Sequence, residues 1–151
     1  GTVHVWGVDA ARLAPHARRR SVGHVDQAFR AVPGTVADQI TLGDPGISRE
    51  EMAQAAQLAG IGAALEALPQ GYDTPYSEGL LSQGQTQLLS IARAVAANPK
   101  LLLLDEITAN LDSGTEQQVM EALRRASQNR AVLSISHRLY EQSGQGRIVQ
   151  I

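Results

Sequence analysis

Two continuous apolar runs with a helical pattern between them constrain the fold of this chain more than any other feature. The first run, Leu101–Leu104, lies between Pro99 and Asp105, and the second, AVLSIS, covers residues 131–136. Short apolar runs without polar alternation are typical of strands that are buried on both faces in a parallel sheet. Parallel neighbours need a crossover connection, which the pattern from about Ser113 to Ala126 supplies as a helix.

The same alternation continues on both sides of these runs. We expect a helix from about Gln83 to Ala97, a short buried strand at residues 21–25 and an edge-like strand at residues 146–151. Val3, Val5 and Val8 around Gly7 indicate a β-hairpin arm at residues 1–8. The predicted fold class is therefore α/β, with a mainly parallel sheet flanked by helices.

Residues 34–80 differ from the rest and are predicted to form a mostly helical insert. Ser48 and Glu51 have the spacing of a capping box, which predicts a helix that ends at Gly60 or Gly62. A short second helix is expected at residues 63–68, before a loop rich in proline and glycine.

Composition excludes several classes of protein. The 151 residues contain no cysteine, so disulfides and thiolate metal sites are excluded. The net charge of -2 argues against nucleic acid as the main partner, and no apolar run approaches the roughly 18 residues of a membrane span. The basic run HARRR at residues 16–20 is interpreted as a solvated face.

Polar groups follow the predicted strands at their carboxyl ends, where ligands gather in open α/β sheets. Asp105 and Glu106 follow the first run, and His137 follows the second. One carboxylate could hold Mg²⁺ and the other could accept a proton from a water, although such a pair can also be a strand leaving the core. His137 is predicted to lie near Glu106 if the two strands are neighbours. Gln27, after the strand at residues 21–25, could touch a metal or a water.

The start of the helix at about Gln83 is a second candidate site. Ser82 is a good N-cap, and Gly84 would let a ligand approach the backbone. Free N–H groups at a helix start favour an anion such as phosphate, but an ordinary helix cap has the same pattern. His4, His16 and His24 show no ligand spacing, and we assign them no role.

The order of these motifs resembles the ATP-binding cassette of ABC transporters over essentially the whole chain. LSQGQ at residues 81–85 resembles the family signature, LLLLDE at 101–106 resembles the Walker B strand, and ANLD at 109–112 resembles the D-loop. PGTVADQITLGDP at residues 33–45 resembles the stretch that follows the Q-loop in exporter-type cassettes. The implied fold is that of P-loop NTPases, with an inserted helical subdomain.

The resemblance implies a role for each motif. Asp105 and Gln27 would hold Mg²⁺, Glu106 would be the general base for the attacking water, and His137 would contact the γ-phosphate. The signature would bind the γ-phosphate of ATP held by a second cassette in a head-to-tail dimer, and Asp112 would couple the two sites. The signature residues are Leu81, Ser82, Gln83, Gly84 and Gln85. The parts implied are a β-arm and Q-loop region (1–33), the helical subdomain (34–80) and the signature, Walker B, D-loop and H-loop core (81–151).

Two features depart from the family pattern. Gln83 replaces the middle glycine of the signature, which matters only if the backbone there needs a positive φ. More seriously, no G-x-x-x-x-G-K-[ST] phosphate loop occurs in the chain. We expect the phosphate loop and its strand to precede Gly1, so the fold would be incomplete and the isolated chain inactive.

The resemblance thus implies an ATPase that couples ATP hydrolysis to export, with ATP and Mg²⁺ as cofactors. Its expected partners are a second cassette and a transmembrane domain at the cytoplasmic face of the cell membrane. The alternatives are a non-catalytic cassette fragment that dimerises or regulates a partner, and a soluble ABC ATPase not tied to transport. The sequence does not identify the cargo, because selectivity lies in transmembrane segments.

Overall fold

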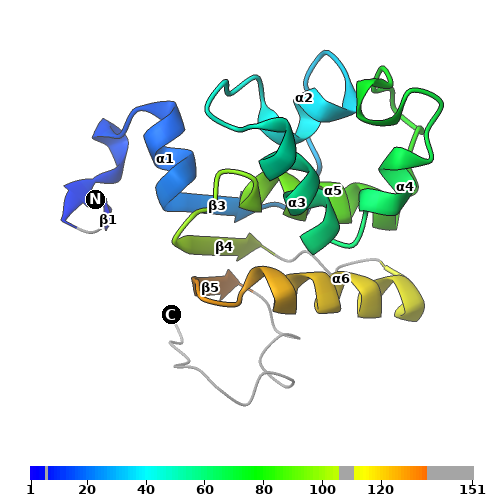
Figure 1. The fold of residues 1–151 in the computed structure, drawn as a ribbon. Coiled ribbons are helices and arrows are strands. Elements are labelled where there is room, and N and C mark those ends of the chain that lie inside the picture. The colour runs from blue at the N-terminus through cyan, green and yellow to red at the C-terminus, as the bar shows by residue number, and fades with distance from the viewer. Residues whose placement is uncertain (6, 106–110, 136–151) are drawn as a thin grey trace.

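The computed structural model describes residues 1–5, 7–105 and 111–135, and its centre is a parallel three-stranded sheet in the order β3-β4-β5. Val25 pairs with Leu104, and Asp105 pairs with Ile135. All three carboxyl ends therefore lie at one edge of the sheet (Figure 1). The strands are β1 (His4–Val5), β2 (Val8–Asp9), β3 (Val22–Val25), β4 (Leu101–Asp105) and β5 (Ala131–Ile135).

The helices match most of the expected positions, including those within residues 34–80. The predicted hairpin is also confirmed, since β1 and β2 pair antiparallel around Gly7. The helices are α1 (Pro15–Ser21), α2 (Val36–Thr41), α3 (Arg49–Leu58), α4 (Gly62–Glu66), α5 (Gln83–Val95) and α6 (Ser113–Ala126), with 3-10 turns η1 (Ala10–Arg12) and η2 (Gly71–Asp73). The strand predicted at residues 146–151 lies outside the described residues.

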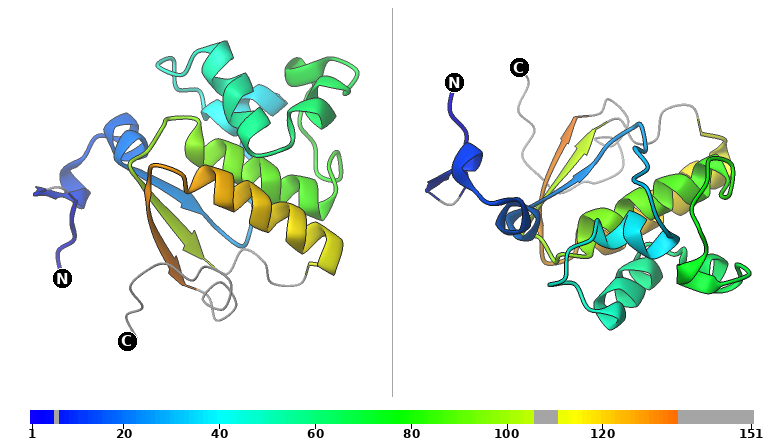
Figure 2. Two further views of the ribbon diagram at one scale, coloured as in Figure 1. Left: turned by 60° about the horizontal axis from the view of Figure 1, so that its bottom comes forward. Right: turned by 90° about the horizontal axis from the view of Figure 1, so that it is seen from above.

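The long helices α5 and α6 lie side by side on one face of the sheet (Figure 2). Leu102 and Leu104 point toward them and are 0% and 4% exposed. Gly23, the partner of Leu102, has no room for a side chain, because a Cβ there would lie 2.7 Å from the carbonyl oxygen of Ala94 in α5. The missing side chain allows α5 to lie directly against β3.

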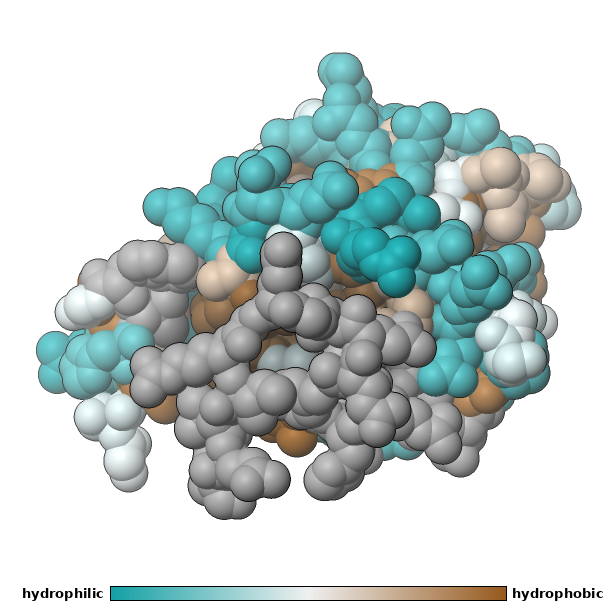
Figure 3. Space-filling model, turned by 90° about the horizontal axis from the view of Figure 1, so that it is seen from below, coloured by the Kyte–Doolittle hydropathy of each residue, from teal (hydrophilic) through white to brown (hydrophobic). Residues whose placement is uncertain are grey.

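The other face of the sheet is more exposed, and this corrects two expectations. Leu101 and Leu103 are only half-buried, so β4 is not buried on both faces. The prediction that the strand at residues 131–136 is buried is wrong, because Leu133 and Ile135 of β5 are 59% and 64% exposed. Apolar residues are visible on the underside of the molecule in Figure 3. Within the described ranges, helices cover one face of the sheet, whereas a continuous apolar run predicts cover on both.

One core joins the helices of residues 34–80 to the sheet. Ile40 and Leu65 belong to the same buried cluster as Leu89 and Leu102. Capping boxes start the helices: Thr35 with Asp38 caps α2, and the predicted box caps α3. Gly60 follows the end of α3 with φ of 79°, a conformation that suits glycine and ends the helix where expected.

Arg93 of α5 connects two further segments, α2 and the segment after β3. Its Nε donates to the carbonyl oxygen of Gln39 in α2, and its Nη1 donates to that of Arg30 at 2.8 Å. The guanidinium also lies 4.2 Å from the ring centroid of Phe29, a cation–π contact. Burial, and then the nearby charge of Arg19, lower the pKa of Arg93 to about 10, so it remains charged at neutral pH.

Arg19 belongs to the basic run at residues 16–20, and the expectation of a purely solvated face is wrong for it. It donates to the carbonyl oxygens of Thr41, Ile40 and Arg93, at 2.6, 3.1 and 3.0 Å. The run forms most of α1, in which Arg18 and Arg20 are exposed and Arg19 is half-buried. Its periodicity alone did not indicate which arginine would point inward.

Gln39 completes this network and is fully buried. Its Oε1 accepts from the backbone N–H of Val32 at 2.9 Å, and its Nε2 donates to the carbonyl oxygens of Val32 and Thr35, at 2.7 and 3.2 Å. The segment after β3 is therefore fastened to α2 by one side chain and to α5 by Arg93.

We predict that Arg93→Met lowers the free energy of unfolding by about 2–4 kcal/mol, because the carbonyl oxygens of Gln39 and Arg30 lose a charged donor. The matched control is Arg124→Met, at an exposed position of α6, which should change it by less than about 0.5 kcal/mol. Urea unfolding followed by circular dichroism measures both. Equal effects of the two substitutions would contradict the structural role of Arg93.

Candidate functional site

The carboxyl edge of the sheet carries the polar residues predicted from the sequence. Asp26 and Gln27 follow β3, and Asp105 is the last residue of β4. Glu106 and His137 follow β4 and β5 but lie outside the described residues. The prediction that His137 lies near Glu106 required their two strands to be neighbours, and β4 and β5 are parallel neighbours.

His24, to which the sequence analysis assigned no role, also lies near this edge. Ligand atoms of His24, Asp26 and Asp105 all lie within 4.8 Å of one another. The sequence could not show this proximity, because it depends on the pairing of β3 with β4, about 80 positions further along. Oxygen ligands such as the Asp105 carboxylate suit Mg²⁺, so this edge fits the predicted cation.

Gln27 is positioned by a contact that the sequence did not indicate. Its carbonyl oxygen accepts a hydrogen bond of 2.8 Å from Nε2 of Gln87, a buried residue of α5. The residue itself is exposed, so its side-chain amide is not taken up by the core. The segment after β3 and helix α5 are therefore joined through Gln87.

The start of α5 is a capping box, as Ser82 predicted. Ser82 Oγ accepts from the N–H of Gln85 at 3.1 Å, and Gln85 Oε1 accepts from the N–H of Ser82 at 3.0 Å. Gln83 is the first residue of the helix and is exposed. Its φ is not positive. Gln83 in place of glycine therefore causes no backbone strain. Leu81 packs against the hydrophobic core.

Gly84 has a packing role that the sequence did not indicate. A Cβ at this position would collide with Cγ2 of Thr115 in α6. The absence of a side chain lets the starts of α5 and α6 lie against each other (Figure 2). The two helix starts form one surface, which lies apart from the end of β4 in both views of Figure 2.

Asp112 is the N-cap of α6. Its Oδ1 accepts from the N–H of Thr115 at 2.9 Å, and its Oδ2 accepts from Oγ1 of Thr115 at 2.7 Å. These hydrogen bonds stabilise the carboxylate and lower the pKa of Asp112. Thr115 thus contacts Asp112 through its hydroxyl and Gly84 through its methyl group, which connects the starts of α6 and α5.

Comparison with known proteins decides the family. Residues 1–109 match the family model described as ABC transporter. The chain belongs to the ABC transporter family. The matched region includes the signature segment and the whole of β4, so the resemblance in the sequence is confirmed.

Relatives and a solved structure agree with this assignment. An uncharacterized ABC transporter ATP-binding protein, YfiC of Bacillus subtilis, is 40% identical over 141 residues, which cover 92% of this chain and 23% of the relative. The mycobactin import ATP-binding/permease protein IrtA of Mycolicibacterium smegmatis is 43% identical over 141 residues, 93% of this chain and 16% of the relative. A bacterial Atm1-family ABC exporter with ATP bound has a TM-score of 0.69 at 39% identity, over 89% of this chain and 24% of that one.

These relatives are much longer than the 151 residues of this ABC family chain, which spans less than a quarter of each. The predicted α/β fold, a parallel sheet flanked by helices, agrees with the exporter structure. None of the helices in the described ranges is long and apolar enough to cross a membrane.

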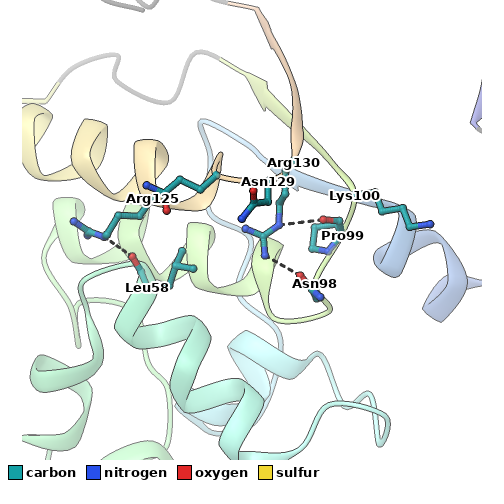
Figure 4. A pocket seen from close by; sticks show the side chains of 8 residues that line it. Leu58, Asn98, Pro99, Lys100, Arg125, Asn129 and Arg130 are labelled. Carbon is teal, nitrogen blue, oxygen red and sulfur yellow. Dashed lines mark hydrogen bonds between the residues drawn. The ribbon is translucent and has the colours of Figure 1, made fainter.

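A hollow of about 410 Å³ lies at the opposite, amino end of the strands (Figure 4). Its cationic side chains are used within the protein. Arg125 donates to the carbonyl oxygen of Leu58 at 2.8 Å, and Arg130 donates to those of Pro99 and Ala126, at 3.0 and 2.7 Å. Because these arginines satisfy carbonyl groups at helix ends and loops, we assign the hollow a structural role.

We predict that Gly84→Ala lowers the free energy of unfolding by about 1–3 kcal/mol, because the new methyl group meets Cγ2 of Thr115. Thr115→Ser removes Cγ2 and should relieve most of this loss in the double variant. Gly114→Ala is the matched control, because a Cβ there would meet only Asp112 Oδ1 at 3.5 Å, an ordinary contact. Urea unfolding of the four variants measures the coupling, and additive effects would contradict the contact.

The lowered pKa of Asp112 predicts a dependence of stability on pH. Its contribution is complete above the unfolded pKa of about 3.9 and is lost as the pH falls through the lower folded value. Asn also caps helices but does not titrate. The difference in melting temperature between the parent chain and Asp112→Asn should therefore shrink from about pH 6 to about pH 3. Glu78→Gln, at an exposed position, should show no such change.

Proposed function

We propose that this chain acts as the nucleotide-binding cassette of an ABC transporter of the exporter type and couples ATP hydrolysis to transport. One observation carries the proposal: Asp105 ends the central strand of the sheet, and the starts of α5 and α6 form one separate surface. A cassette that works as a dimer needs both, one to hold the cation of its own nucleotide and one to meet the nucleotide of its partner.

The chemistry proposed at the strand edge is hydrolysis of ATP. Asp105 and the side chain of Gln27 would hold Mg²⁺, which when bound offsets the negative charge of the phosphates. Glu106 would take the proton of the attacking water, and His137 would contact the γ-phosphate. Positioning and charge stabilisation are the main requirements of phosphoryl transfer, and polar groups at one sheet edge can meet both.

The proposed partner is a second cassette, arranged head to tail. A helix leaves its first N–H groups without intrahelical partners. Ser82 takes up the N–H of Gln85, so those of Gln83 and Gly84 remain for the γ-phosphate of the partner's ATP. Asp112 caps the neighbouring helix, and we propose that it transmits changes between the two sites through Thr115 and Gly84.

The proposed location is the cytoplasmic face of the cell membrane, in contact with a transmembrane domain. IrtA is named an ATP-binding/permease protein, and the solved neighbour is an ABC exporter. Hydrogen bonds of Arg93 to Gln39 and of Gln87 to Gln27 connect α5 both to α2 and to the segment after β3. That network offers a path by which nucleotide binding could reach the membrane domain.

The 151 residues lack a phosphate loop, so we propose that they do not hydrolyse ATP by themselves. This feature also favours the second candidate function, a non-catalytic cassette that dimerises with or regulates a partner. The two candidates differ in one respect, namely whether the gene encodes G-x-x-x-x-G-K-[ST] upstream in the same cassette.

We predict that the 151-residue chain shows no Mg-ATP turnover and that a version extended upstream through the phosphate loop does. In the extended version, Glu106→Gln should lower kcat by about 10²–10⁴, the usual contribution of a general base. Glu121→Gln, at an exposed position of α6, is the matched control and should leave kcat unchanged. A release assay for inorganic phosphate measures all four proteins.

The outcomes separate the candidates. Turnover that depends on Glu106 in the extended protein supports the ATPase. An extended protein without turnover, or a gene without the phosphate loop, supports the non-catalytic cassette. Turnover by the 151-residue chain itself would contradict the proposed need for a phosphate loop.

A further inference from the structure

We propose that His24, Asp26 and Asp105 form a three-ligand site for a divalent transition ion such as Mn²⁺ or Zn²⁺. The inference deepens the proposed function, on which it rests for the nucleotide that would share the ion. It assigns direct ligands to His24 and Asp26, beyond the Asp105 and Gln27 of the proposed Mg²⁺ site.

The strand register places the three side chains on one face. Gly23 and Val25 of β3 face the helices, as do their partners Leu102 and Leu104. Side chains alternate along a strand, so His24 and Asp26 project from the opposite face. Asp105 lies on that same face, one residue beyond Leu104 and level with Asp26. His24 and Asp105 therefore stand on adjacent parallel strands, and Asp26 directly follows β3.

The distances suit a shared ion. The three ligand atoms lie within 4.8 Å of one another. Nitrogen and oxygen ligands bind such ions at roughly 2.0–2.2 Å, so two ligands on one ion lie at most about 4.4 Å apart. Small rotations of side chains that are exposed or half-buried close this difference without a change in the backbone.

Charge also favours a cation here. Asp26 and Asp105 bring two carboxylates to one edge, and in the described ranges the ion pairs found involve other acids, Asp9 and Asp73. No lysine or arginine within those ranges forms an ion pair with either carboxylate. An ion bound between the two carboxylates would offset their mutual repulsion.

The imidazole determines which cation fits best. Mg²⁺ prefers oxygen ligands and retains several waters, whereas imidazole nitrogen suits transition ions. A ligand set of one histidine and two carboxylates therefore predicts tighter binding of Mn²⁺ or Zn²⁺ than of Mg²⁺. His24 is exposed, which leaves open positions on the ion for water or phosphate oxygens.

Titration of the 151-residue chain with Mn²⁺, without nucleotide, tests the site by electron paramagnetic resonance of the free ion. We expect one Mn²⁺ per chain, with affinity lowered about tenfold or more in His24→Ala and in Asp26→Asn. His16→Ala, at an exposed histidine of α1, is the matched control and should bind as the parent does. Competition by Mg²⁺ should be weak in the parent chain and stronger in His24→Ala.

Circular dichroism of each variant confirms that the fold is retained, and Asp26→Asn gives a second test that keeps the side-chain shape. Absence of saturable binding at one site, or equal affinities of the parent chain and His24→Ala, would overturn the proposal. Equal losses in His24→Ala and His16→Ala would also overturn it, since they would indicate non-specific binding. Because no nucleotide is present, Mn²⁺ binding without ATP turnover in the extended cassette would contradict the proposed function alone.

Discussion

The half-buried guanidinium of Arg93 makes the contacts on which the rest of the structure depends. It joins the signature helix α5 to α2 through Gln39, and to the segment after β3 through Arg30 and Phe29. Arg19 donates to the carbonyl oxygen of Arg93 itself and so ties α1 to the same point. A charge that is partly removed from water needs hydrogen bonds to replace its hydration, and here backbone carbonyl groups from separate segments supply them.

The contacts of α5 connect parts of the chain that lie far apart in the sequence. Gln27 is held by Gln87 of α5, six positions before Arg93 on the same helix. At the start of that helix, Gly84 contacts Thr115, which also binds Asp112. A rigid helix with fixed contacts along its length connects the Q-loop, the signature and the D-loop segment. We infer that movement of any one of these segments displaces α5 first.

Much of the fold could be predicted from local pattern. The capping boxes at Ser48 and Ser82 start helices where the sequence indicated, and α6 covers the range expected from its periodicity. The strand ends that carry Asp105 and Gln27 could also be predicted, because polar residues directly follow apolar runs. Less predictable was burial: β5 has an apolar sequence but is exposed, since cover for a strand depends on what packs against it.

By itself, the sequence determined the family, the order of strands and helices, and the residues proposed to act on nucleotide, because each of these depends on short motifs and local periodicity. Only the tertiary structure decided that His24 lies beside Asp26 and Asp105. It also decided that Arg19 turns inward, and that position 84 has no room for a side chain beside Thr115. These contacts join positions far apart in the chain. They are set by strand register and by helix packing, which no local pattern encodes.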